Sequence, residues 1–252
     1  MALGLMPFGL VLLVVAALAA LSPPESRMAG FATSLSGRTP AQRHNARLAA
    51  RSLNGARIPA GGLFSFNGTV QTWSLDRGYV RAPVSYDGSL VPAFGGGVCQ
   101  TSTALYNAAL LAGMAITERH HHVFAPHYVP PGRDAAVAYP NIDLRFRNPY
   151  PFPVRLRSSV DGDILRVEMW GRTDTRTEYQ LVTRVLSASP PETVRRTVPR
   201  KAGKPAVARY AGIGGFRVVT YRVARKNGRE VRRERLSDDA YPSMPNILAF
   251  AE

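Results

Sequence analysis

Proline and glycine interrupt this chain often enough to favour turns and short strands over long helices. The 252 residues include 20 Pro and 22 Gly. Both residue types mark turns, because Pro lacks a backbone donor and Gly reaches backbone angles that other residues avoid. The hydrophobic content of 45% is sufficient for one large core or two modest ones. We therefore predict an ordered α+β protein rather than a helical bundle.

The N-terminus has the pattern of an export signal. The first 24 residues carry no charged side chain, and Leu10 to Leu21 is an unbroken run of Leu, Val and Ala. We interpret residues 1–24 as a signal peptide or a membrane anchor, which places the rest of the chain outside the cytoplasm. Cys99 is the single cysteine, so an internal disulfide is excluded. A free thiol is unusual in an exported chain and points to a chemical role.

The strongly basic charge narrows the choice of partners. The formal net charge is +15, and 29 of the 32 basic residues are Arg, spread over the whole length. Such a surface suits anionic wall polymers or lipid headgroups, although codon usage alone can produce an Arg-rich composition. Basic residues do not cluster with aromatic ones, so we expect no nucleic-acid partner.

Capping signals predict two helices. Thr39-Pro40-Ala41-Gln42 is a capping-box pattern with Pro at the first helical position, and Gly55 is a suitable stop. A second helix is expected over Gln100–Leu111, with Gly113 ending it. This helix carries small and apolar residues on one side, and we expect it to pack on an antiparallel sheet.

Period-two patterns and turn dipeptides predict two hairpins. One has its turn at Asp161-Gly162, and the other at Asn227-Gly228. The polar segment Gly171–Pro191 lies between them and has the composition of a boundary. We predict a first domain over residues 31–171 and a small all-β domain over residues 190–252. The Arg residues of that second domain alternate with Val and Tyr, which is typical of a solvated sheet face.

A glycine-rich loop delivers the cysteine to the start of the second helix. Backbone N–H groups and the helix dipole stabilise a thiolate there, so the pKa of Cys99 should fall. The same N–H groups, in Gly95, Gly96 and Gly97, can bind the oxyanion of an acyl-transfer intermediate and let a substrate backbone approach. Gln100 can add a side-chain donor, and Thr101 lies beside it at the same helix start.

A thiolate nucleophile needs an imidazole and an acid. His120, His121 and His122 follow on a segment with a strand pattern, so His120 and His122 should share one face. The acid is then Asp134 or Asp143. This order of loop, Cys on a helix, His on a strand and acid is similar to that of papain-like and transglutaminase-like cysteine enzymes.

Two other interpretations of these residues remain open. Cys99 can be an inert core residue, with the glycines present for packing. Alternatively, His120 and His122, with His127 or Cys99, would supply three metal ligands and an open position. The neighbouring Glu118 and Arg119 are expected to form an exposed pair.

Five segments together resemble the VanW-like domain, over roughly residues 31–171. They are FATSLSGRTPAQRHNARLAARSLNG, FSFNGTV, GGGVCQTSTALYNAALLAG, ERHHHV and YVPPGRDAAV. His122 falls where the family pattern carries its His. The resemblance implies a cell-envelope protein of Gram-positive type, in a family named after an accessory member of vancomycin-resistance gene clusters. The tail, with Gly212, Gly214-Gly215 and Asn227–Val231, resembles a degenerate wall-associated β module of the five-glycine type, a class thought to bind amino sugars of the wall.

Three functional hypotheses follow. The first is a cysteine-dependent peptidoglycan peptidase, transpeptidase or amidotransferase that uses Cys99, His122 or His120, and Asp134 or Asp143, without a cofactor or metal. The second is a non-catalytic module that binds peptidoglycan or glycan. The third is a metal-dependent hydrolase that uses the His cluster. The expected partners are peptidoglycan or another wall polymer, and the membrane if the N-terminal segment is retained.

Overall fold

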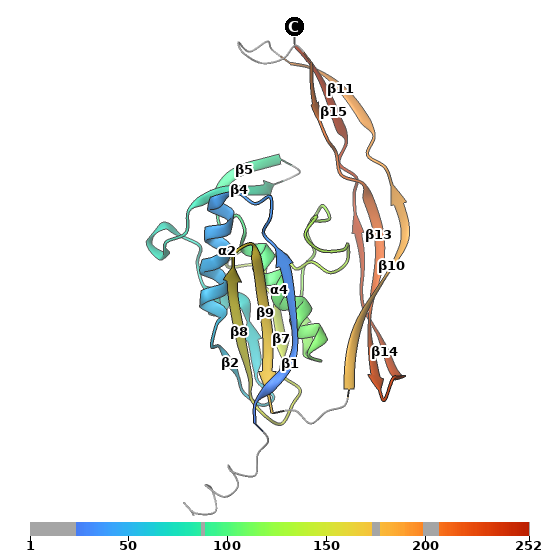
Figure 1. The fold of residues 1–252 in the computed structure, drawn as a ribbon. Coiled ribbons are helices and arrows are strands. Elements are labelled where there is room, and N and C mark those ends of the chain that lie inside the picture. Colours follow the sequence, from blue (N-terminus) through green and yellow to red (C-terminus); the bar gives the residue numbers. More distant parts are fainter. Residues whose placement is uncertain (1–23, 87–88, 173–176, 199–206, 252) are drawn as a thin grey trace, which may run out of the picture.

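Strands dominate the molecule, which has an N-terminal domain beside an elongated C-terminal module (Figure 1). The structure is a computed structural model that describes residues 24–86, 89–172, 177–198 and 207–251. Strands hold 49% of the described residues and helices 18%. The predicted α+β class, with its papain-like or transglutaminase-like arrangement, is therefore wrong. The reason is that the described chain from residue 177 onward adds strands alone, so the two long helices are a minor part of the whole.

The predicted signal or anchor at residues 1–24 lies almost wholly outside the described residues. In the part of the chain that is described, none of the helices combines the length and the apolar character needed to span a membrane.

The main sheet of the N-terminal domain has four antiparallel strands. In spatial order they are β1 (Ser26–Ser34), β9 (Ile164–Gly171), β8 (Val154–Asp161) and β2 (Arg57–Ile58). The turn between β8 and β9 is the predicted one, because Asp161 pairs with Ile164 and Gly162 has a φ of 53°. Alternate side chains of β8 and β9 are buried in the core, which confirms the period-two prediction.

Two long helices pack on one another, and the second also packs on β1 and β9. α2 (Pro40–Leu53) starts with the predicted capping box, since Thr39 and Gln42 exchange hydrogen bonds. α4 (Val98–Leu111) carries the cysteine, and all of its residues from Gln100 to Leu110 are buried. α4 is thus the most buried helix of the domain, and α2 packs both on α4 and on strand β8.

Shorter elements complete the N-terminal domain. A small sheet has the order β3 (Leu63–Ser65), β7 (Arg145–Arg147) and β6 (Ala115–Glu118). The hairpin of β4 (Arg81–Tyr86) and β5 (Ser89–Phe94) leads into α4. Between β3 and β4 lie α3 (Phe66–Val70) and the 3-10 turn η1 (Leu75–Arg77).

The C-terminal module contains two three-stranded sheets, end to end (Figure 1). The first is antiparallel, in the order β10 (Thr177–Ser189), β13 (Gly215–Lys226) and β14 (Arg229–Tyr241). The second has the order β11 (Thr193–Val198), β15 (Asn246–Ala251) and β12 (Val207–Tyr210). The hairpin at Asn227-Gly228 is confirmed, with φ angles of 51° and 75° at its turn. β10 occupies most of the segment that the sequence suggested as a boundary, and the predicted limits of two independent domains stay a prediction.

The module contacts the end of α4 through a buried arginine. Arg222 of β13 is 8% exposed and donates at 2.6 Å to the carbonyl oxygen of Met114, just beyond α4, while Glu234 of β14 neutralises it at 2.7 Å. The prediction that the arginines of this tail form a solvated face is thus wrong for Arg222.

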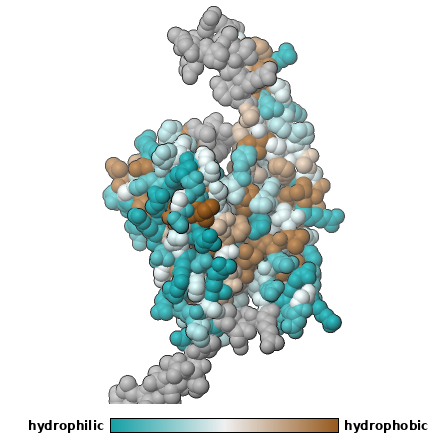
Figure 2. Space-filling view, viewed as in Figure 1, coloured by the Kyte–Doolittle hydropathy of each residue, from teal (hydrophilic) through white to brown (hydrophobic). Residues whose placement is uncertain are grey.

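On the face that Figure 2 shows, apolar side chains gather mainly over the module. Val182, Val185 and Val231 are among the exposed apolar residues of the module.

The close approach of α2 and the start of α4 depends on Gly97. Its φ is +103°, and a Cβ there would lie 2.2 Å from the carbonyl oxygen of Gln42. We expect Gly97→Ala to lower the free energy of unfolding by about 3 kcal/mol, because backbone strain adds to overpacking. The control is Gly37→Ala, since Gly37 has a φ of +76° but no atom within 4 Å of a built Cβ, and its cost should be about 1 kcal/mol. Equal losses in urea unfolding would contradict the packing argument.

Candidate active site

The loop after β5 places Cys99 in the first turn of α4. Gly95 and Gly97 have positive φ angles of 89° and 103°, and Gly97 is the N-cap. The helix starts at Val98, two residues before the predicted position, so Cys99 is its second residue. The side chain of Cys99 is partly buried, and its sulfur lies 3.4 Å from the carbonyl oxygen of Val137.

The three glycines are required by packing. A Cβ on Gly95 would lie 2.6 Å from Trp73, and one on Gly96 would lie 2.7 Å from the carbonyl oxygen of Pro83. Because protein atoms fill these positions, the space beside the glycines is not available for the backbone of a substrate. What the loop contributes is a fixed start for α4.

The first turn of α4 has backbone donors without a hydrogen-bond partner in the described part of the chain. The N–H of Val98 donates to Gly95 and that of Gln100 to Gly97, at 2.9 and 3.2 Å. Among the described residues, no hydrogen bond is found for the N–H of Cys99 itself. Backbone N–H groups without a partner at a helix start can stabilise a negative charge.

The side chains of Gln100 and Thr101 have other partners. The amide nitrogen of Gln100 donates to Thr33 and Ser34 of β1, and its oxygen accepts from Arg38. Thr101 donates to the carbonyl oxygen of Ala46 in α2. Both residues are at most 2% exposed, so in this structure they connect elements rather than face Cys99.

The three histidines diverge. β6 ends at Glu118, and only a single bridge involves His120, so the predicted strand does not extend through them. His120 is exposed and contacts Glu118 at 3.2 Å. His121 lies edge-on to Tyr241. His122 turns inward to Asp134, so the expectation that His120 and His122 share a face is wrong, because the regular strand already ends at Glu118.

His122 connects Cys99 with Asp134. The Nδ1 atom of His122 lies 2.6 Å from Oδ2 of Asp134, and the backbone N–H of His122 donates to the same oxygen at 2.7 Å. The imidazole is close enough to the Cys99 thiol for a side-chain hydrogen bond between them to shift both pKa values. A thiol, an imidazole and a carboxylate therefore lie in the order that is found in cysteine nucleophile sites.

Asp143, the other predicted acid, lies elsewhere. Its carboxylate accepts hydrogen bonds from the hydroxyl of Ser65 and the backbone N–H groups of Asn67 and Leu144, at 2.6 to 2.8 Å. These contacts fix the short helix α3 to the start of β7. The structure therefore brings Asp134, and not Asp143, to the histidine.

Polar side chains on α4 hold the segment that carries Asp134. Ser102 donates to the carbonyl oxygen of Ala135 at 2.6 Å, and Thr103 accepts from the N–H of the same residue at 3.0 Å. Asn107 donates to the carbonyl oxygen of Arg133 at 2.7 Å. Since all three are buried, these bonds are costly to break. They fix Asp134 alongside the helix that carries Cys99, and the sequence analysis missed this function of the polar residues on α4.

The electrostatics favour a thiolate and an imidazolium. Burial raises the pKa of the Cys99 thiol, but the hydrogen bond and charge of His122 lower the pKa by more. Burial likewise disfavours the imidazolium of His122, yet the hydrogen bonds to Asp134 and Cys99 raise its pKa to about 10. Burial opposes the charge of Asp134 as well, while His122 and Arg119 lower its pKa to about 2. At neutral pH His122 and Asp134 are therefore charged, and the lowered pKa of Cys99 favours its thiolate.

Two further residues complete the site and were not predicted. Oδ1 of Asp134 accepts hydrogen bonds from Tyr241 at 2.6 Å and from Arg119 at 3.1 Å. Arg119 is buried, with a side-chain exposure of 7%, so the predicted exposed pair with Glu118 is wrong. Tyr241 comes from β14, more than 100 residues after Asp134, and no local pattern in the sequence could associate the two.

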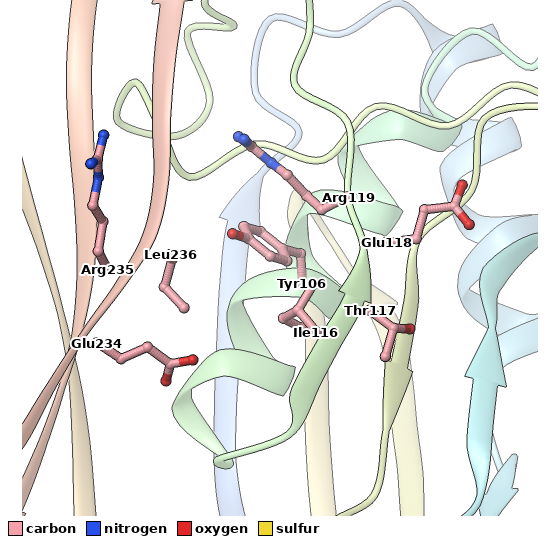
Figure 3. A pocket seen from close by; sticks show the side chains of 8 residues that line it. All are labelled: Tyr106, Ile116, Thr117, Glu118, Arg119, Glu234, Arg235 and Leu236. Atoms are coloured by element: carbon pink, nitrogen blue, oxygen red, sulfur yellow. The ribbon is translucent and has the colours of Figure 1, made fainter.

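A cavity of about 240 Å³ lies on the module side of Arg119. It is lined by Tyr106, Ile116–Arg119 and Glu234–Leu236. Figure 3 shows Arg119 and Tyr106 extending into the space between α4 and β14. Cys99 does not line this cavity, so the cavity is not the place where a substrate meets the thiol.

Within the described residues, no cluster of three or more His, Cys, Asp or Glu side chains has a metal-binding arrangement.

Comparisons with known proteins extend these findings. Two solved G5 domains match the chain. The G5 domain of an IgA1 protease is 20% identical and covers 31% of this chain and 95% of its own, with a TM-score of 0.20. The G5 domain of HP0197 is 22% identical and covers 29% of this chain and 99% of its own, with a TM-score of 0.15. G5 domains are the class that the five-glycine resemblance of the tail names.

Two relatives match this chain by sequence over more than half of its length. Protein YoaR of Bacillus subtilis is 33% identical over 149 residues, which are 59% of this chain and 49% of YoaR. The vancomycin B-type resistance protein VanW of Enterococcus faecalis is 35% identical over 142 residues, or 54% of this chain and 52% of VanW. This chain thus spans about half the length of these relatives. The VanW-like protein family matches residues 41–170. That match covers half of the chain and includes Cys99, His122 and Asp134, and the chain accordingly belongs to the VanW-like family.

Proposed function

We propose that this protein acts in the cell envelope as a thiol-dependent acyl transferase on wall peptides. The observation that carries the proposal is the arrangement of Cys99, His122 and Asp134, in which a carboxylate fixes the imidazole and the imidazole lowers the pKa of the thiol. The orphan amide of Cys99 supplies a donor for the oxyanion. Support for the envelope comes from membership of the VanW-like family, from a relative that is a vancomycin-resistance protein, and from a net charge of +15, which suits anionic wall polymers.

The chemistry proceeds in two steps. The Cys99 thiolate attacks the carbonyl carbon of a peptide bond, and the oxyanion that forms accepts a hydrogen bond from the backbone N–H of Cys99. The C–N bond then breaks, and the departing amine takes the proton of the His122 imidazolium, which leaves a thioester. In the second step, an amine or water gives a proton to neutral His122 and attacks the thioester, which releases the thiolate. An amine acceptor gives transpeptidation or amidation, and water gives hydrolysis.

The reactivity of Cys99 towards iodoacetamide tests the ion pair. The thiolate forms above the lowered pKa of Cys99, and His122 keeps its proton up to about pH 10, so both are charged between these limits. We expect His122→Gln to reduce the labelling rate at pH 7 by about tenfold or more. The reason is that each unit of increase in the pKa of the thiol lowers the fraction of thiolate about tenfold. Labelling is followed by mass spectrometry between pH 5 and 10.

The matched control is His120→Gln. His120 is exposed, contacts only Glu118 with its ring, and should leave the labelling rate unchanged. If wild type and His122→Gln label equally slowly while both are folded, Cys99 is a packed thiol, and a non-catalytic wall-binding protein remains.

Turnover on purified peptidoglycan fragments tests the reaction itself. Cys99→Ala should abolish release or exchange of peptides while the circular dichroism spectrum and the melting temperature stay close to wild type, because the side chain is only partly buried. Fragments with and without an added amine distinguish transpeptidation from hydrolysis. Turnover by Cys99→Ala at the wild-type rate would rule out the thiol as nucleophile.

A further inference from the structure

The carboxylate of Asp134 is held from two sides by different parts of the chain. Oδ2 faces His122, whereas Oδ1 accepts from the Tyr241 hydroxyl at 2.6 Å and from Arg119 at 3.1 Å. Asp134 itself is fully buried. A carboxylate bonded through both oxygens cannot rotate without losing a charged hydrogen bond. The orientation of the acid towards His122 therefore depends on its partners at Oδ1.

One of those partners is anchored by the C-terminal module. Nη1 of Arg119 donates to both carboxylate oxygens of Asp239, at 2.7 and 2.8 Å. The side chains of Arg119 and Asp239 are 7% and 6% exposed, so solvent screens this pair little. Asp239 and Tyr241 are separated by one residue on β14 and point to the same side of the strand.

The module also forms hydrogen bonds to the backbone just before Asp134. The N–H of Gly132 donates to the Tyr241 hydroxyl, and the carbonyl oxygen of Gly132 accepts from Thr220, both at 3.0 Å. A Cβ on Gly132 would lie 2.5 Å from the Thr220 hydroxyl oxygen. β13 and β14 thus fix both the backbone and the carboxylate of the segment that carries the acid.

We propose that the C-terminal module is a working part of the cysteine site, in which Tyr241 and Asp239 are positioning residues that hold Asp134 on His122. This inference rests on the proposed function of Cys99 and extends it, because it makes docking of the module a condition for thiol chemistry. Neither residue contacts the sulfur, and both act through Asp134.

The sequence of charges explains why Asp239 matters. From the module to the thiol, the groups alternate in sign: Asp239, Arg119, Asp134, His122 and Cys99. Tyr106 of α4 lies under Arg119, with the guanidinium carbon 5.4 Å from its ring centre, and it is neutral at ordinary pH. Without Asp239, this series loses a negative charge and Arg119 loses the anchor that directs it to Oδ1 of Asp134, so the imidazolium of His122 is less stabilised. Buried ion pairs are not an efficient way to dock two surfaces, so a role for the charge itself accounts for their presence.

The experiment compares Asp239→Asn with Asp238→Asn in the full chain. Asp238 is the neighbouring, exposed residue of β14, and its partners Arg217 and Arg235 lie at the surface. We expect Asp239→Asn to lower the pKa of His122 by about one unit, a tenfold loss of proton affinity, and to slow iodoacetamide labelling of Cys99 at pH 7 several-fold. Asp238→Asn should leave both quantities unchanged. Asp239→Glu keeps the charge, so its pKa of His122 and its labelling rate should lie between those of Asp239→Asn and wild type. The pKa of His122 is read from its ring nitrogens by NMR.

The outcomes separate the two proposals. If wild-type Cys99 labels as an ordinary thiol and His122 titrates near 6.5, the proposed function itself fails. If wild-type Cys99 is reactive but Asp239→Asn matches it in both measurements, only the role of the module is overturned. Where Asp239→Asn does not fold, Tyr241→Phe decides, because it keeps the ring against His121 and removes only the hydroxyl. Unchanged labelling and an unchanged pKa of His122 in that variant overturn the inference, and slower labelling with a lower pKa supports it.

Discussion

The negative charge of Asp134 is the constraint on which the rest of this structure depends. A buried carboxylate is stable only where donors replace the water it has lost, and Asp134 is completely buried. Its donors are His122 and Arg119, which follow β6, and Tyr241, which belongs to β14. Satisfying one charge thus brings together the loop of the N-terminal domain and the strand of the C-terminal module.

The position of that charge is set in turn by α4. A helix buried along nearly its whole length would ordinarily be apolar all round, yet this one carries Ser102, Thr103 and Asn107 inside the protein. Each bonds to the backbone of residues 133–135, so the helix binds the acid segment on the same side on which it presents Cys99. Cys99 and the segment that carries Asp134 are therefore both fixed by one rigid helix, which keeps the geometry between them constant.

Local signals could be read from the sequence, and long-range ones could not. The capping box at Thr39, the stop at Gly113 and the turns at Asp161-Gly162 and Asn227-Gly228 are confirmed, because each depends on residues within one turn of the chain. The fold class was wrong because long strands such as β10 were assigned to a boundary. Arg119 was assigned to the surface because its partners Asp134 and Asp239 lie 15 and 120 residues away.

Two influences lower the pKa of the Cys99 thiol, the start of helix α4 and the hydrogen bond with His122, and they differ in size. A helix start favours a negative charge by about 0.3–1 kcal/mol, whereas a hydrogen bond to a charged group contributes about 1.5–3 kcal/mol. Burial of the thiol opposes its ionisation, so the helix start alone is too weak an influence to produce a thiolate. The hydrogen bond and charge of His122 are the stronger influence on the Cys99 thiol, and the hydrogen bond to Asp134 raises the pKa of that imidazole. The glycine loop therefore determines where the sulfur lies, and the pKa of the thiol depends more on the His122–Asp134 pair than on the helix start.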